Sequence, residues 1–302
     1  MNWIIIAMFP PLLWGISNFI DKHLILKYFK SEGLGALLIF SSLIGTIILP
    51  FIYLFDPSVL RIPFFSGFLI VVTGILYVAA MFPYLHALNR DEASTVAPLF
   101  QLMPVFNYFL AYYFLNEQLT SGQIMASLLI IFGAILISLD INEKMPKIKT
   151  DVLWLMALSS LLFSITTLIF KFVALEERFW RTTFWEYIGL TIAAIVLFSI
   201  KKYRIQFFNI IRENKLSFIG LNFANEGITI AGRMIMGFAS LLAPLALVWV
   251  INGFQPVFVF IIGIVLTIFF PHFGEESLRK RHLAQKIIAI VIMFIGAYLL
   301  SK

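Results

Sequence analysis

Ionisable and polar side chains recur at helical spacing in otherwise apolar stretches of the chain, and residues 222–233 hold the densest group. Asn222, Asn225, Glu226 and Arg233 fall on one face of a helix. Inside a membrane such residues are costly and face a protein-lined space. This spacing predicts that Glu226 carries a proton or binds a cation, and that Arg233 binds an anionic group. The alternative is that Glu226 is a structural hydrogen-bonding partner and that Arg233 extends to water at the helix end.

Smaller polar groups lie on other apolar segments. Asn18 and Asp21 share a face of the first segment, and Lys171 ends a stripe of Ser and Thr residues in the sixth. Hydroxyl and aromatic stripes in membrane helices often serve packing, which stays open as an alternative here. The candidate substrate-binding residues are Asn18, Tyr77, Gln101, Tyr108, Lys171, Asn222, Asn225, Arg233 and Asn252. The candidates for proton or ion coupling are Asp21 and Glu226.

Patterns typical of enzymes, metal sites and nucleotide sites are absent from the sequence. It contains no Gly-rich phosphate loop followed by Lys and Ser or Thr, which argues against ATP-driven activity. The 4 His residues show no metal-ligand spacing, and without Cys no disulfide can form. We therefore expect no catalytic residue, no metal and no cofactor. The expected partners are a small-molecule substrate and membrane lipid, with the monomer and the homodimer both open.

Composition identifies the solvent of this chain as lipid. Of its 302 residues 61% are hydrophobic and 13% are charged, whereas soluble domains carry about 25% charged residues. The net charge of +6 lies in short connections, so we expect no nucleic-acid partner. Residues 3–20 lack a basic leader region and a small-residue cleavage site, which predicts a permanent span. The protein is expected to be a multi-pass integral membrane protein, in the plasma (inner) membrane.

Ten apolar stretches are long enough to cross a bilayer, which needs about 20 residues each. They cover residues 3–26, 35–55, 65–88, 94–115, 122–140, 152–173, 182–200, 216–238, 241–269 and 284–301. Residues 201–215 are predicted to be a basic connection at the membrane surface. Glu117 is predicted to cap the helix that follows it.

The two halves of the chain resemble each other. Residues 93–99 (ASTVAPL) recur as residues 239–245 (ASLLAPL), each opening a span. Gly133-Ala134 matches Gly296-Ala297, and Lys22 matches Lys171. Because five is odd, a second copy of five spans inserts upside down relative to the first. The predicted fold class is an all-α membrane protein of ten transmembrane helices, a five-plus-five inverted repeat around a central cavity, with repeats at residues 1–142 and 151–302.

Two motifs carry a family resemblance. One is residues 13–19 (LWGISNF) followed by Lys22, and the other runs from Pro104-Val105 through residues 117–123 (EQLTSGQ) to Gly133. Here the sequence resembles the drug/metabolite transporter superfamily, specifically its ten-span EamA-type members. The resemblance covers essentially the whole chain. It implies helices around a central cavity, alternating access, and export or import of small metabolites without specifying which.

These observations predict a secondary transporter that moves a small polar metabolite (amino-acid-like, zwitterionic or anionic) by alternating access, with proton coupling as one candidate driving force. A lipid or lipid-linked sugar flippase, a membrane-embedded lipid enzyme and a structural subunit are the alternatives. Most of the 22 Lys and Arg residues lie in odd-numbered connections, which predicts termini outside the cell. The family resemblance implies cytoplasmic termini, so the orientation stays open.

Overall fold

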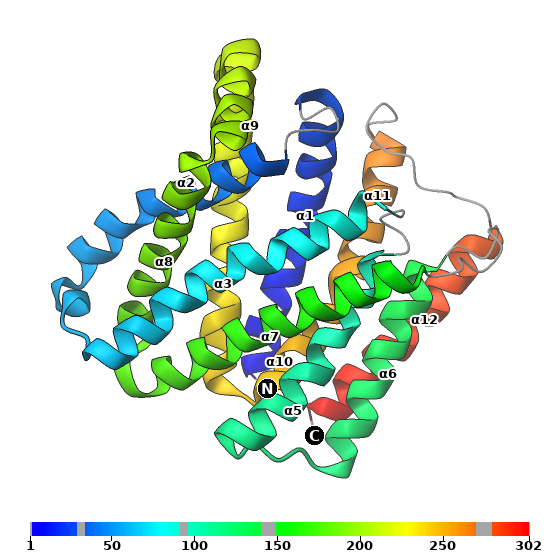
Figure 1. Ribbon diagram of the computed structural model, residues 1–302. Helices are drawn as coiled ribbons and strands as arrows, with labels where there is room; N and C mark the ends of the chain where they lie inside the picture. Colours follow the sequence, from blue (N-terminus) through cyan, green and yellow to red (C-terminus); the bar gives the residue numbers. More distant parts are fainter. Residues whose placement is uncertain (1, 29–33, 91–95, 140–148, 270–279, 302) are drawn as a thin grey trace.

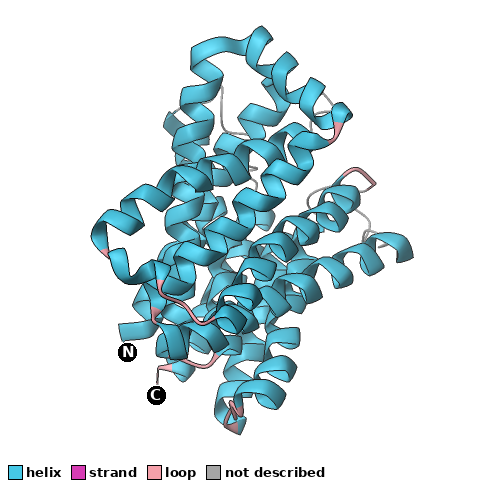
Figure 2. Cartoon of the chain, turned by 60° about the vertical axis from the view of Figure 1, so that its left-hand side comes forward, coloured by secondary structure: helices cyan, strands magenta, loops and turns pink. Residues whose placement is uncertain are grey.

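A computed structural model describes residues 2–28, 34–90, 96–139, 149–269 and 280–301, and in these ranges the chain is helical with no strand (Figures 1 and 2). The helices of the first half are α1 (Asn2–Tyr28), α2 (Leu34–Phe55), η1 (Pro57–Leu60), α3 (Phe64–Leu88), η2 (Ala97–Gln101), α5 (Leu102–Leu115) and α6 (Ser121–Ser138). Those of the second half are α7 (Thr150–Glu177), α8 (Phe179–Ser199), α9 (Lys201–Leu242), α10 (Leu245–Ile251), η3 (Asn252–Phe254), α11 (Gln255–Phe269) and α12 (Lys280–Leu300). The all-helical class is confirmed.

Among the described residues, 8 segments are long and apolar enough to cross a membrane, judged by length and composition. They lie in α1, α2, α3, α6, α7, α8, the stretch from α10 to α11, and α12. The expected span at 94–115 is divided between η2 and α5, and the one at 216–238 is part of the more polar α9. The exact ten-span count therefore stays a prediction.

The helix α9 differs from the expected structure. Residues 201–215 do not form a surface connection but begin a continuous helix of 42 residues (Figure 1). No Pro or Gly occurs between Lys201 and Phe218, so nothing in the backbone chemistry stops the helix there. At 1.5 Å per residue α9 is about 63 Å long, roughly twice the thickness of a hydrocarbon core.

The two halves of the sequence are interleaved in space. The helix α3 packs against α7 and α8, while α1 packs against α9 and α11. The helix α6 packs against α12, and α2 packs against α8. In the predicted repeat α1 corresponds to α7, and α3 corresponds to α9. The contact of α3 with α7 in one direction then corresponds to the contact of α9 with α1 in the other, and both contacts are present. This pairing fits the predicted inverted repeat, whose division at residues 1–142 and 151–302 stays a prediction.

The matched glycines of the two halves lie at one helix crossing. A Cβ added at Gly133 of α6 would lie 2.3 Å from Met293 of α12, and one at Gly296 of α12 would lie 2.8 Å from the Ala126 carbonyl of α6. Buried Ile130 and Met293 pack beside them in the largest apolar core. The sequence similarity between the halves thus coincides with a tight contact of α6 with α12.

Gly74 of α3 and Gly189 of α8 allow the closest approach of two helix backbones in this region, and this predicts a stability change. A Cβ added at Gly189 would lie 2.1 Å from the Val71 carbonyl oxygen, so Gly189→Ala is expected to push the helices apart at a cost of about 1–3 kcal/mol. Thermal unfolding of the purified protein, followed by tryptophan fluorescence, measures this loss. The control is Gly227→Ala in α9, where an added Cβ meets nothing within 4 Å, and stability is expected to stay equal or rise. Equal effects of the two exchanges would contradict the prediction.

Candidate functional site

A cavity of about 520 Å³ lies between helices from both halves of the chain. Its charged wall residues are Asp21, Glu186, Arg233 and Lys286. Aromatic rings supply much of the remaining wall, and Trp14 and Trp249 stack with ring centroids 6.3 Å apart. A cavity of this size holds a small organic molecule, and its polar groups are few enough to orient one.

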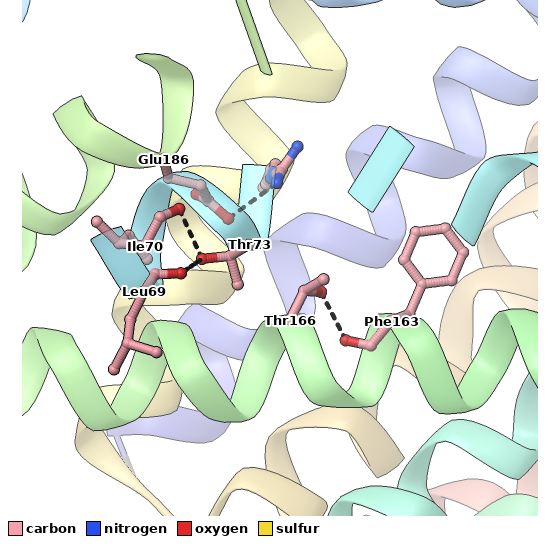
Figure 3. A network of polar contacts seen from close by, with 7 residues as sticks. Leu69, Ile70, Thr73, Phe163, Thr166 and Glu186 are labelled. Carbon is pink, nitrogen blue, oxygen red and sulfur yellow. Dashed lines mark hydrogen bonds and ion pairs between the residues drawn. The ribbon is translucent and has the colours of Figure 1, made fainter. Parts of the chain in front are cut away.

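An ion pair occupies the middle of the cavity wall. The Arg233 guanidinium of α9 donates to Glu186 Oε1 of α8 at 2.9 Å and lies 3.7 Å from the centre of the Tyr77 ring of α3. Figure 3 shows Glu186 near Thr73 of α3 and Thr166 of α7. Both hydroxyls bond back to carbonyl groups of their own helices, so they serve helix geometry. The ion pair holds the positive charge of Arg233 at the cavity wall, and the carboxylate of Glu186 balances this charge.

A second polar group joins α1 to α9. Ser17 Oγ donates to Asn225 Oδ1 at 2.8 Å, and Asn225 Nδ2 donates to Asp21 Oδ1 at 2.6 Å. The Thr229 hydroxyl lies 3.2 Å from Ser17 Oγ. Ser17, Asp21 and Thr229 line the cavity, while Asn225 is 1% exposed and lies behind them. Local helical spacing brings Ser17 and Asp21 together, but only the packing of α1 on α9 adds Asn225.

Uncommitted polar atoms gather where two helices are interrupted. Gln101 ends η2 and Asn252 begins η3, and a Cβ added at the adjacent Gly253 would lie 3.3 Å from Gln101 Oε1. Gln101 Oε1, Asn252 Oδ1 and Trp249 Nε1 are buried and have no hydrogen-bond partner in the protein. All three side chains line the cavity. A buried polar atom without a partner costs about 1–3 kcal/mol, so these atoms favour a bound polar molecule.

A second ion pair lies outside the cavity wall. Lys171 Nζ of α7 pairs with Glu117 and donates to the Ala243 carbonyl at 2.7 Å. Glu117 Oε2 also accepts from the Leu245 amide at the start of α10, at 2.7 Å. Glu117 therefore does not cap α6, whose cap is the Thr120 hydroxyl in a capping box with Gln123. Glu117 fastens the turn after α5 to α7 and α10.

The structure brings some of the predicted site residues together and separates others. Those on the cavity wall are Asn18, Asp21, Tyr77, Gln101, Arg233 and Asn252. Lys171 forms an ion pair with Glu117 away from the wall. Tyr108 packs beside Tyr112 on α5, and Tyr112 is 44% exposed. Glu226 accepts from the Ser41 hydroxyl of α2 behind the cavity. Asn222 and Asn225 are likewise buried away from the wall.

Glu186 and Lys286 are charged wall residues that the sequence did not single out as site candidates, and Glu186 is the one paired with Arg233. In the sequence Glu186 follows Trp180 and Trp185 at the beginning of the predicted span 182–200, a pattern typical of an interfacial belt. The available signal was an acidic residue within a run that is apolar enough to cross a membrane. In the described part of the chain, no three His, Asp or Glu side chains are grouped as metal ligands would be.

Comparisons with known proteins agree with this architecture. A solved structure described as "Crystal structure of protein" has 14% sequence identity to the chain and a TM-score of 0.65, covering 99% of this chain and 96% of the other. This likeness shows the fold. The comparison with curated proteins found no match. Residues 1–139 match the EamA-like transporter family. The match covers the first 139 of the 302 residues, and together with the apolar helices it indicates a multi-pass membrane transporter similar to the EamA-like family of the drug/metabolite superfamily.

Proposed function

We propose that the protein is a secondary transporter of the plasma membrane that moves small amino-acid-like, zwitterionic or anionic metabolites by alternating access. The observation that carries this proposal is Arg233 on the wall of a cavity enclosed by helices of both halves. A buried guanidinium in a membrane protein is retained where it serves a substrate pathway or a bound ligand. Its planar donors suit a carboxylate.

The remaining polar wall residues support a zwitterionic substrate. Asp21 offers a carboxylate to an ammonium group once its proton has left, and Arg233 offers donors to a carboxylate. Both side chains line the same cavity. Gln101 and Asn252 contribute uncommitted amide oxygens that suit further donors of the ligand.

The interrupted helices support alternating access. Secondary transporters commonly bind substrate where membrane helices are discontinuous, at the interface of two repeats. Here η2 precedes α5, and η3 lies between α10 and α11, with Pro98 and Pro256 beside the interruptions. These short segments bring Gln101 and Asn252 to the cavity, so a small change in their backbone would alter the site directly.

Proton coupling completes the proposal. Asp21 and Glu226 are largely buried, and no ion pair joins either of them to a described side chain. Carboxyl groups without a cation inside a membrane are the usual carriers of protons in transporters. The absence of a nucleotide-binding motif from the sequence also favours an ion gradient as the energy source.

A second candidate, a lipid or lipid-linked flippase, has one observation in its favour. An apolar hollow of about 540 Å³ lies on the outside of α1, α8 and α9, lined by Ile6, Phe9, Phe179, Trp180, Met234, Ile235 and Phe238. It suits an acyl chain. A flippase would scramble a fluorescent lipid in proteoliposomes, whereas the proposed metabolite transporter would leave that lipid in place.

Flux measurements test the proposal. Proteoliposomes are loaded with a labelled amino-acid mixture, and an imposed proton gradient is expected to drive saturable flux. Gln101→Leu and Asn252→Leu are expected to lower this flux at least tenfold, because each removes a polar atom worth about 1–3 kcal/mol when buried. The matched control is Gln118→Leu at an exposed turn, where flux should match that of the wild type. Undiminished flux in both wall variants would remove this cavity from the transport pathway.

A further inference from the structure

We propose that Asp21 binds one proton, which it shares with Ser17 one turn away on the same helix, beside the contact of α1 with α9. The proposal names the carrier of the proton within the proposed proton-coupled function. It differs from the expectation based on sequence, which placed Glu226 first. The geometry favours Asp21 because its side chain lines the cavity, while Glu226 is held by Ser41 behind the wall.

Three oxygen–oxygen contacts converge on the Ser17 hydroxyl. Its Oγ lies 2.8 Å from Asn225 Oδ1, 3.2 Å from Thr229 Oγ1 and 3.4 Å from Asp21 Oδ2. Each such contact is favourable only if a hydrogen lies between the two oxygens, since two acceptors repel in a medium of low dielectric constant. The third contact is long for a hydrogen bond and lies within α1, so all three contacts are satisfied together only when three hydrogens are present.

The side chains supply only two of these hydrogens when Asp21 is ionised. Ser17 donates its hydrogen to Asn225 Oδ1, and Thr229 donates its own to Ser17 Oγ. A carboxylate at Asp21 is an acceptor only, so its Oδ2 contact with Ser17 has no hydrogen. A proton on Asp21 Oδ2 supplies the third. Ser17 then makes one donor and two acceptor interactions, which is the full capacity of a hydroxyl.

The groups that face Asp21 leave room for this proton. From α9, Glu226 interacts electrostatically with Asp21, and Arg233, which lines the same cavity, is bound to Glu186 of α8. The phenols of Tyr77 and Tyr84 face it from α3, and Lys286 of α12 lines the same cavity. Cavity-lining residues of α10, η3 and α11 are not ionisable, and His23 follows on α1 itself. Among the described side chains none forms an ion pair with Asp21, which is compatible with a bound proton at this carboxyl group.

Asn222 provides an independent indication of exchange at this site. It lies one turn along α9 from Asn225, it is 1% exposed, and neither its amide nitrogen nor its amide oxygen has a hydrogen-bond partner. A deprotonated Asp21 needs an additional donor, and the Asn222 amide is an uncommitted one on the same face of the same helix. Loss of the proton would therefore favour a different contact between α1 and α9.

Infrared spectroscopy of the purified protein in lipid nanodiscs tests the proposal without substrate and without transport. The wild-type spectrum minus that of Asp21→Asn, at neutral pH, is expected to contain the carbonyl band of a protonated carboxyl group that shifts in D₂O. Asp21→Asn should fold, because its amide donates to Ser17 as the protonated acid does. Ser17→Ala is expected to keep this band but shift it to higher frequency, since a hydrogen bond is lost. The matched control is Glu226→Gln, which should retain it.

A difference spectrum without that band would overturn the proposal, and so would loss of the band when Na⁺ replaces K⁺, which would assign the site to a metal cation. Because the band is measured without transport, failure of the proposal about Asp21 can be distinguished from failure of the proposed transport function. A band without proton-driven flux would leave the proton site and remove the transport proposal. Proton-driven flux without a band would do the reverse.

Discussion

Lys171→Met is expected to destabilise the folded protein by about 3–5 kcal/mol, because it leaves the carboxylate of Glu117 without its cation. The two side chains are only 5% and 16% exposed, so solvent does not replace the lost partner. The exchange also removes the donor to the Ala243 carbonyl, which lies at the break between α9 and α10. Thermal unfolding in detergent, followed by tryptophan fluorescence, measures the loss.

The double variant Lys171→Met/Glu117→Gln is the decisive comparison. It removes the charge that the single exchange leaves buried, and its glutamine can still accept from the Leu245 amide, so it is expected to recover most of the lost stability. The control pair is Arg90 with Asp151, which is 51% and 50% exposed, and Arg90→Ala should leave the midpoint unchanged. A single and a double variant with the same midpoint would show that the buried charge is not the cause.

Arg233→Met is expected to destabilise the folded protein by about 3–5 kcal/mol, because it leaves the carboxylate of Glu186 without its cation. It is also expected to abolish flux, because it removes the proposed carboxylate-binding group. Glu186→Gln is expected to destabilise the folded protein by roughly 1–2 kcal/mol less than Arg233→Met does. Arg233 keeps the face of the Tyr77 ring at 3.7 Å, and a glutamine can still accept its hydrogen bond. Glu186 has no comparable second partner among the described hydrogen bonds.

Unfolding midpoints of these two variants and of Glu186→Gln/Arg233→Met separate stability from function. The double variant is expected to be more stable than Arg233→Met but equally inactive, because the fold needs charge balance and the substrate needs the guanidinium. Flux in any variant without Arg233 would contradict its role as the carboxylate-binding group. Equal destabilisation by the two single exchanges would contradict the contribution of Tyr77.

The membrane class, the helical architecture and the helix breaks could be predicted from the sequence because they depend on local properties. Apolar runs of span length and Pro98 within η2 act over a few positions. The capping box of α6 is equally local, although the predicted cap was Glu117 rather than Thr120. The wall positions of Gln101 and Asn252 follow from the same local signals. These features need no knowledge of which helices are neighbours.

Partners across the bundle could not be predicted in this way. Lys171 is a predicted substrate-binding residue at the end of a Ser and Thr stripe for which packing stayed open. In the structure Ser164 donates to the Met103 carbonyl, and Thr167, which also lines the cavity, donates to Asn107, so the stripe joins α7 to α5. Glu117 was read as a local cap and instead reaches α7 and α10. One polar face is compatible with a cavity or with a helix contact, and only the long-range packing decides between them.

The interleaving of the two halves has a consequence for biosynthesis. When the ribosome has completed the chain through α6, α1 still lacks α9, α3 lacks α7, and α6 lacks α12. The close-packing glycines of α3 and α6 then meet lipid or a chaperone rather than a helix. Assembly must therefore wait for most of the chain, and the interval between insertion and docking is when the nascent protein is most exposed to quality-control proteases.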